Sequence, residues 1–456
     1  MRYPAKENSE SHIKRDQSNL APRAGGVKTI GSTIGYRLLI QMLNAGTGIL
    51  TARMLQPAGR GELAVITLWS GLIAGLTTLG LPNSLIYHLR TFPEKSSKLV
   101  ASAVSINFIV SLLACLISVF WIPTWLRQYP LWAIRAAQWF LIVTPLISTT
   151  SVLRGALEAT GAFSVSNIIQ LLTPAITLAM LLAFLFSHHF NTFTAGFAYI
   201  ITAVPTFVII CWHARVFFKH RVPPGFPDSQ MLLSYGLRSY GIDLLGTLAL
   251  QVDQVLVVRF LAPADLGLYV VTLSLSRMLN IFQNSVVMVL FPRAAGRTPL
   301  EALELTSRAA SVSLLVTGLS AVGVAVAGPF LLGIFYGKAY TRSSTSLRIL
   351  LLEVTLSGCV FVLAQAFMAL GRPGIVTILE AFGLSLSIPL MVVLIPRLGI
   401  DGAALSLLIS TCLRFVFLYI SFPLILRVPT PNLIPRRKDL ALLTASLRKS
   451  RSPQQA

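Results

Sequence analysis

Long apolar runs of about 20 residues recur along most of the chain and alternate with short polar segments. A run of this length is typical of a helix that spans the hydrocarbon core of a bilayer. Proline marks several breaks, as at Gln56-Pro57, Phe92-Pro93 and Phe291-Pro292, because it cannot continue a regular helix. The pattern predicts twelve spanning helices, at residues 36–55, 63–89, 99–120, 131–157, 162–187, 193–218, 232–258, 266–291, 309–335, 347–369, 374–395 and 402–426.

One short motif occurs twice, each time between two predicted spans. It covers Arg53 to Gly61 (RMLQPAGRG) and Arg259 to Gly267 (RFLAPADLG). Long internal repeats in an apolar chain are typical of membrane transporters. Six predicted spans per repeat is an even number, so both repeats enter the membrane from the same side. The sequence therefore predicts an all-α polytopic membrane protein with two parallel six-helix lobes.

The lobe boundaries follow from the spans and from the basic segments around them. We expect basic tails at 1–30 and 427–456, lobes at 31–218 and 232–426, and a linker at 219–231. Lys and Arg are concentrated in the segments that share a side with the N-terminus, and such segments are usually cytoplasmic. This pattern predicts that both tails and the linker are cytoplasmic.

The composition excludes a soluble protein with one core. Of the 456 residues, 54% are hydrophobic and only 12% are charged, against about 25% charged in soluble domains. The net charge of +21 comes from residues between apolar runs, which favours contact with anionic membrane lipids over nucleic acid. Residues 436–451 fit either an amphipathic helix on the membrane surface or a disordered basic tail.

No cofactor is predicted. Cys115, Cys211, Cys359 and Cys412 lie singly in apolar runs, without the spacing of metal ligands. The sequence also contains no phosphate-binding loop of the Gly-Lys-Ser/Thr type, which argues against ATP hydrolysis.

Four segments resemble bacterial oligosaccharide flippases, namely Leu55–Leu63, Leu79–Pro82, Ala369–Gly374 and Leu394–Ala404. The chain is similar to the family that exports O-antigen and exopolysaccharide units, within the multidrug/oligosaccharidyl-lipid/polysaccharide exporter superfamily. The resemblance implies a MATE-like fold in the inner (cytoplasmic) membrane and alternating access. It further implies an undecaprenyl-diphosphate-linked oligosaccharide as the substrate and a polysaccharide polymerase as a partner.

Polar residues inside predicted spans are costly and are therefore candidates for function. The candidates for substrate binding share helix faces in three spans: Arg37, Gln41 and Asn44 in the first, Arg277, Asn280 and Asn284 in the eighth, and Arg414 in the twelfth. A guanidinium matches the oxygens of a diphosphate with parallel donors. We expect these side chains to line a central cationic cavity. In the alternative, Arg277 and Arg414 pair with Asp243, Asp253, Glu353 or Glu380 for structural reasons, and the two roles are compatible.

Three carboxylates in the second lobe are candidates for ion coupling. Asp243, Asp253 and Glu380 lie in predicted spans, where a carboxylate can bind and release a proton or sodium ion during transport. The alternative is that each carboxylate only anchors its helix.

Other functions remain open at this point. A membrane enzyme such as a polymerase or ligase usually carries its site on long loops, whereas the loops predicted here are short. An exporter of cationic drugs would have the same architecture but a cavity dominated by acidic and aromatic residues. Lipid II flippases of the superfamily usually have two further helices, which the sequence does not predict.

Overall fold

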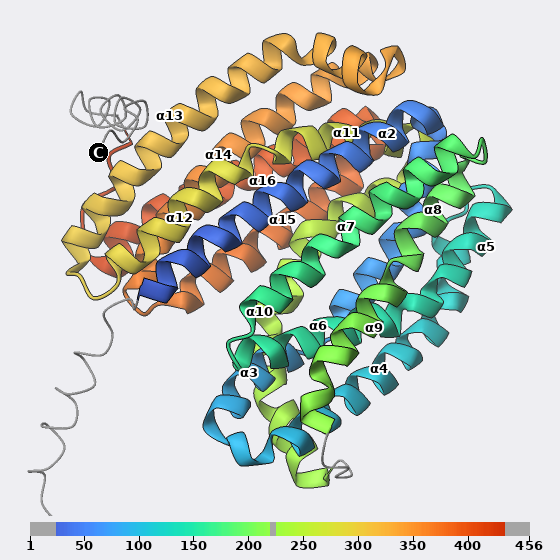
Figure 1. Cartoon of the computed structure of the whole chain (residues 1–456). Helices are drawn as coiled ribbons and strands as arrows, with labels where there is room; N and C mark the ends of the chain where they lie inside the picture. Colours follow the sequence, from blue (N-terminus) through green and yellow to red (C-terminus); the bar gives the residue numbers. More distant parts are fainter. Residues whose placement is uncertain (1–23, 219–224, 434–456) are drawn as a thin grey trace, which may run out of the picture.

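The computed structural model describes residues 24–218 and 225–433 (Figure 1). These residues form helices, and no strand occurs among them, so the all-α prediction is confirmed. Most of the two predicted tails, part of the predicted linker and the segment 436–451 lie outside the described residues.

The first half contains α2 (Ala24–Leu76), α3 (Leu81–Thr91), α4 (Ser96–Trp125), α5 (Leu131–Phe140), α6 (Thr144–Ala159), α7 (Phe163–Phe186), α8 (Thr192–Ile201) and α9 (Ala203–Ala214). The second half contains α10 (Phe226–Phe260), α11 (Pro263–Arg277), α12 (Asn280–Ala294), α13 (Pro299–Leu331), α14 (Ser344–Ala369), α15 (Pro373–Leu398) and α16 (Ile400–Ser421). Short 3-10 or π turns are η1 (Pro93–Lys95), η2 (Leu141–Val143), η3 (Arg215–Phe218), η4 (Leu332–Tyr336), η5 (Lys338–Ser343) and η6 (Phe422–Leu426). Figure 1 shows α3–α9 in one group and α11–α16 in another, and the long helices α2 and α10 contact both.

Helix α2 consists of two arms that meet at Gln56, whose φ of 61° and ψ of 175° are not helical. Pro57 follows, and a proline both lacks an N–H donor and disfavours the helical conformation of the residue before it. The predicted break at Gln56-Pro57 is therefore confirmed.

Nine helices among residues 24–218 and 225–433 are long and apolar enough to span a membrane. Helix α10 makes a tenth if its two segments, which meet at 47°, form one span. The kinked stretch Gly35–Thr91 counts once although its 57 residues measure roughly 85 Å as helix, more than twice the hydrocarbon core. Helices α11 and α12 have 15 residues each and do not count singly. The protein is polytopic, and the count of twelve stays a prediction.

The predicted span 131–157 is interrupted by η2, a 3-10 turn between α5 and α6. Pro145 lies in the first turn of α6 and cannot donate a hydrogen bond to the carbonyl four residues earlier. That carbonyl belongs to Leu141, and the thiol of Cys115 donates to it at 3.4 Å. The backbone N–H of Thr144 also donates to this carbonyl, so the thiol is its second donor.

The two copies of the repeated motif lie against each other. A Cβ atom on Gly61 would be 1.7 Å from the carbonyl oxygen of Pro263, and one on Gly267 would be 1.9 Å from that of Pro57. Equivalent positions of the two copies therefore make the same contact in both directions, as in a two-fold relation. Only glycine fits at both positions, because any side chain would overlap the facing backbone.

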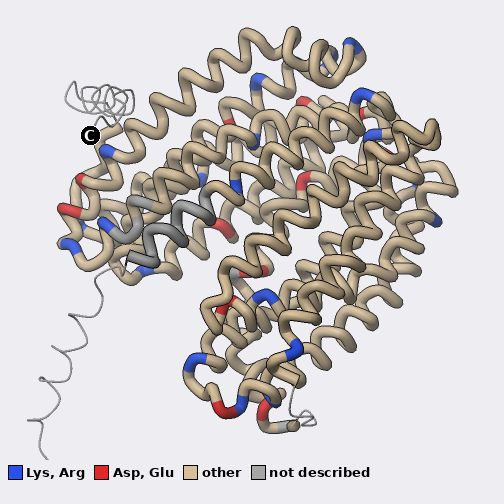
Figure 2. Tube along the Cα trace, viewed as in Figure 1, with Lys and Arg blue, Asp and Glu red and all other residues tan. Residues whose placement is uncertain are grey.

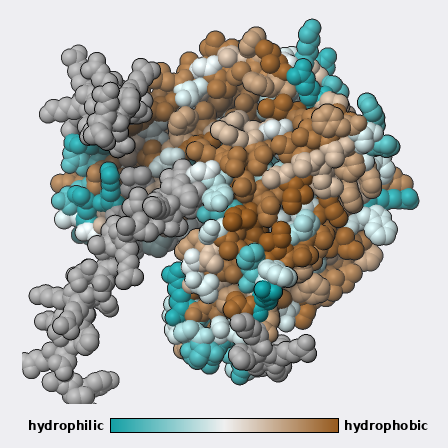
Figure 3. All heavy atoms as spheres, in the orientation of Figure 1, coloured by the Kyte–Doolittle hydropathy of each residue, from teal (hydrophilic) through white to brown (hydrophobic). Residues whose placement is uncertain are grey.

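The outside of the helix groups is apolar. Large side chains such as Phe120, Trp139 and Val326 are 80%, 73% and 78% exposed. Figure 3 shows a broad hydrophobic face with hydrophilic residues towards its edges, and Figure 2 shows most charged residues towards the helix ends, with a few inside. An apolar surface of this extent fits contact with lipid chains.

Candidate functional site

Two neighbouring cavities lie between the helices. The first has a volume of about 390 Å³ and is lined only by α10, α11, α12, α14, α15 and α16 of the second half. The second has a volume of about 500 Å³ and lies between the halves, because α2 and α8 line it together with α11, α12 and η4. Arg277, Asn280 and Asn284 line both cavities.

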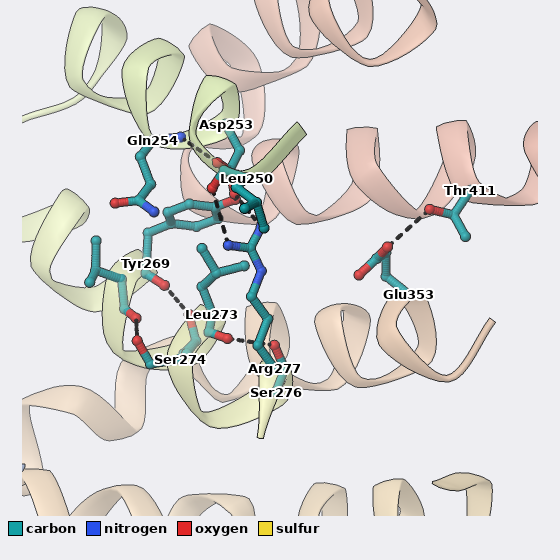
Figure 4. Close-up of polar contacts among 12 residues, drawn as sticks. Leu250, Asp253, Gln254, Tyr269, Leu273, Ser274, Ser276, Arg277, Glu353 and Thr411 are labelled. Carbon is teal, nitrogen blue, oxygen red and sulfur yellow. Dashed lines mark hydrogen bonds and ion pairs between the residues drawn. The ribbon is translucent and has the colours of Figure 1, made fainter. Parts of the chain in front are cut away.

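Arg277 is held by a buried carboxylate at the junction of the cavities (Figure 4). Its guanidinium Nη2 lies 3.1 Å from Oδ2 of Asp253, which is 1% exposed. The hydroxyl of Tyr269 donates to the same oxygen at 2.9 Å, and the backbone N–H of Gln254 donates to Oδ1 at 2.8 Å. Arg277 is also the last residue of α11, where the helix dipole favours a cation. Three donors therefore bind the carboxylate of Asp253, and one of them is Arg277.

Arg414 forms the second ion pair, with its Nη2 2.5 Å from Oε1 of Glu380. This pair joins α16 to α15, and its side chains are 19% and 35% exposed. A Cβ atom on Gly383 would be 2.3 Å from Cδ of Arg414. The missing side chain of Gly383 thus makes room for the arginine to reach the cavity.

Two further polar residues line the first cavity. Glu353 on α14 accepts a hydrogen bond of 3.0 Å from the hydroxyl of Thr411. Gln283 donates its amide to the carbonyl of Val354 at 2.9 Å, and Gly358 leaves the space that this amide occupies. Sequence reasoning considered Glu353 only as a structural partner and missed Gln283, because an isolated glutamine in an apolar run gives little signal.

Most predicted site residues come together. Arg277, Asn280, Asn284, Arg414 and Glu380 line the first cavity, and Asn44 lines the second. Asp253 lies behind Arg277 as its partner. Both arginines make the ion pairs of the structural alternative and also line a cavity, so the two predicted roles coexist in position.

Two predicted residues lie elsewhere. Arg37 is exposed and is not among the residues that line either cavity. The carboxylate of Asp243 accepts two hydrogen bonds, of 3.0 and 3.1 Å, from the amide of Asn83 on α3. Asp243 therefore links α10 to the first half rather than lining a cavity.

Arg60 lines the second cavity, although the sequence pattern placed it in an external loop. The backbone of α2 kinks at Gln56, and Arg60, just after the kink, lines the same cavity as Gln41 and Asn44 of the first arm. The signal was its position inside the repeated motif, next to Gly61. Helical periodicity alone does not predict such a meeting across a kink.

The cavities offer guanidinium groups, amides and hydroxyls to a polar ligand, together with carboxylates that pair two of the arginines. Such a lining suits an anionic, hydroxyl-rich molecule, because guanidinium binds oxyanions and amides bind hydroxyls. Within residues 24–218 and 225–433, no group of three or more His, Cys, Asp or Glu could hold a metal ion.

An all-helical, multi-pass membrane chain with a polar cavity between two halves has the architecture of a membrane transporter. A family model described as "Polysaccharide biosynthesis protein" matches residues 27–296, which is more than half of the 456 residues. The chain belongs to this family.

Solved structures show the same fold. The chain is similar to the inward-closed structure of the lipid II flippase MurJ, with a TM-score of 0.72 over 92% of this chain and 93% of that chain, at 13% identity. It is also similar to an inward-facing multidrug resistance MATE family transporter of the MOP superfamily, with a TM-score of 0.65 over 87% and 99%, at 15% identity. The predicted MATE-like fold is confirmed, and the proteins that share it are transporters, not enzymes.

A curated relative is the probable low-salt glycan biosynthesis flippase Agl15 of Haloferax volcanii, which is 23% identical over 213 residues. The match spans 46% of this chain and 45% of that protein, so less than half of its length is compared. The resemblance stated from the sequence motifs is thus confirmed for the family and the fold.

Proposed function

We propose that the protein is a flippase that moves undecaprenyl-diphosphate-linked oligosaccharides across the cytoplasmic membrane for O-antigen or exopolysaccharide synthesis. The observation that carries this proposal is the polar cavity between the halves, lined by Arg60, Arg277 and four amide side chains, in a member of a polysaccharide biosynthesis family. An anionic diphosphate attached to sugars matches cations and amides in one place.

The proposed mechanism is alternating access by two lobes at 31–218 and 232–426. The polar head crosses through the cavity while the polyprenyl chain stays in the lipid, because transferring a sugar–diphosphate head into hydrocarbon is prohibitively costly. The contact between Gly61 and Gly267 lies beside Arg60 and joins the halves at that end. In this mechanism the contact separates when the cavity opens there.

Coupling, orientation and partners complete the proposal. Asp253 and Glu380, which hold the cavity arginines, are the better placed carboxylates for proton or sodium coupling, whereas Asp243 binds Asn83. Both termini would be cytoplasmic by the distribution of Lys and Arg. Anionic lipids and a polysaccharide polymerase are the expected partners.

Lipid II transport is the second candidate, because the structural likeness to MurJ covers 92% of this chain. Lipid II has a polyprenyl diphosphate too, so the two substrates differ in the sugar and peptide part. Export of cationic drugs fits less well, because the cavity between the halves is lined by arginines and amides and by no acidic side chain.

The test is leaflet translocation in proteoliposomes of stated orientation, with fluorescent undecaprenyl-diphosphate oligosaccharide, lipid II and a cationic dye as parallel substrates. Arg277→Gln, at a residue that lines both cavities, should reduce translocation of the oligosaccharide lipid about tenfold, as expected for one charge-assisted contact. Arg127→Gln is the matched control, because Arg127 is exposed and lines neither cavity.

Translocation of the oligosaccharide lipid alone would support the proposal. Translocation of lipid II alone, or of the dye alone, would replace it by the corresponding alternative. No movement of any substrate under either a proton or a sodium gradient would reject the flippase assignment for the isolated chain.

A further inference from the structure

Arg60 differs from the other two cavity arginines in its bonding. Arg277 and Arg414 each make an ion pair, with Asp253 and Glu380. Arg60 has neither an ion pair nor a hydrogen bond to any residue that the structure describes. Its Nε is buried without a partner, as is the Nε of Arg414, so the difference lies in the missing carboxylate. Of the cavity arginines in the described chain, it is therefore the one whose charge no carboxylate neutralises.

The surroundings of Arg60 supply no anion and many neutral hydrogen-bonding groups. Gln41 and Asn44 from the first arm of α2, and Asn280 and Asn284 from α12, line the same cavity. The aromatic side chains of Tyr199 and Tyr336 line it as well. A partly desolvated guanidinium in such a cavity is costly without an anion. An incoming oxyanion would find the N–H donors on Nη1 and Nη2 of Arg60, and it would have no carboxylate to displace from them.

The backbone around Arg60 is held from two sides. A Cβ atom on Gly59 would be 2.9 Å from the hydroxyl oxygen of Thr192 at the start of α8, and one on Gly61 would be 1.7 Å from the carbonyl of Pro263. Arg60 thus lies between two close contacts, one with the first half and one with the second. A guanidinium whose backbone is already fixed loses less conformational freedom when it binds a ligand.

We propose that Arg60 is the anion-binding residue of the cavity between the halves and binds a phosphate or carboxylate group of the transported glycolipid. The inference rests on the proposed function for the identity of the ligand. It assigns the anion to Arg60 rather than to Arg277, because Arg277 is already paired with Asp253. The oxyanion is either the diphosphate of the carrier or the acid of a uronate sugar, and both present the same paired oxygens.

Direct binding tests this assignment without transport. The full chain in detergent is titrated with inorganic pyrophosphate and, separately, with glucuronate, and ligand-dependent protection against thermal unfolding is followed. Arg60→Gln should raise the half-saturating concentration of the binding anion about tenfold, and Arg60→Lys less, because lysine keeps the charge but loses the paired donors. Arg127→Gln should bind as the wild type does. Without ligand, Arg60→Gln should unfold at no lower temperature than wild type, because it breaks no ion pair.

Loss of pyrophosphate protection in Arg60→Gln would assign the diphosphate, and loss of glucuronate protection alone would assign a sugar acid. If both anions protect wild type and Arg60→Gln equally, the inference is overturned. If Arg60→Gln does not fold, Arg60→Lys takes its place, and equal protection of Arg60→Lys and wild type overturns the inference. The same variants are then assayed for translocation.

If anion binding depends on Arg60 but the wild type translocates no glycolipid, the proposed function is rejected and this site is kept. Wild-type translocation unaffected in Arg60→Gln would reject the site and keep the function.

Discussion

The two halves of the chain share a backbone contact but differ in their buried charges. Gly61 and Gly267 occupy equivalent motif positions and make the same contact with the facing proline carbonyl. The second half holds two ion pairs beside a cavity of its own, one with a buried carboxylate and one partly exposed. The first half contributes amides and Arg60 to the cavity between the halves. The two copies of the motif thus make the same backbone contact, whereas both ion pairs beside the cavities lie in the second half.

This difference has a physical basis. A glycine at a backbone crossing is required at both equivalent positions, since each would otherwise clash with the other copy. A cavity that binds one polar head has no such requirement for equal contributions from both halves. The following predictions test that contrast, from the largest expected effect to the smallest.

The ion pair of the second half should matter most for stability. Arg277→Ala leaves the buried carboxylate of Asp253 without its cation and should cost about 3–5 kcal/mol, measured by equilibrium unfolding in detergent. The double variant with Asp253→Ala should recover part of this loss, because neither charge is then left unpaired. Additive losses in the double variant would contradict the pairing, and Tyr269→Phe, which removes one donor, serves as the milder control.

The glycine contact should respond alike in both halves. Gly61→Ala and Gly267→Ala should each destabilise the protein by about 1–3 kcal/mol through overlap with the facing carbonyl, and translocation should fall with them. Gly46→Ala and Gly246→Ala are the matched controls, because a Cβ atom at either position meets no atom within 4 Å. An effect in one half only would break the proposed equivalence of the two copies.

The second ion pair should matter less than the first. Glu380 is 35% exposed, so water can solvate it when Arg414→Ala removes its partner, and the loss of stability should be about 1 kcal/mol. The measurement is the same unfolding assay, with raised salt as a second condition that weakens an exposed pair. A loss as large as that of Arg277→Ala would show that the pair is desolvated.

The smallest effect is expected where α10 meets the first half. Asn83→Ala removes both hydrogen bonds to Asp243, and because the bonds are exposed the cost should be about 0.5 kcal/mol. If Asp243 couples transport to an ion, the variant should instead change the dependence of translocation on a proton or sodium gradient. Translocation kinetics with and without each gradient separate a structural link from a coupling site.

Several features of the fold followed from local sequence. The break at Gln56-Pro57 and the turn before Pro373 lie where they were predicted, because proline acts through its own ring and its missing N–H. The interruption of the span 131–157 at Leu141–Val143 was not predicted, although Pro145, which lacks an N–H donor, follows two residues later. The Cys115 thiol, which donates to the Leu141 carbonyl in this turn, comes from another helix, and local sequence does not reveal that contact.

The candidate site was predicted in composition and only partly in arrangement. Arg277, Asn280 and Asn284 share a helix face, and they line both cavities. Arg37 continues the stripe of Asn44 on paper, yet it lies outside both cavities, because a stripe defines a direction and not how far along the helix the cavity extends. Arg60 lies just beyond the predicted span 36–55 and was therefore expected in a loop, whereas the cavity extends far enough to include it.

The sequence by itself determined that the chain is an all-α, polytopic membrane protein with an internal repeat and positive charge in particular spans. Length of apolar runs, proline and glycine are local properties, and each acts through the residues beside it. Only the tertiary structure decided that Arg277 and Arg414 are paired, that Arg60 is not, and that the two motif copies meet at Gly61 and Gly267. Those relations join residues far apart in the chain, and packing of the two halves alone sets the distances between them.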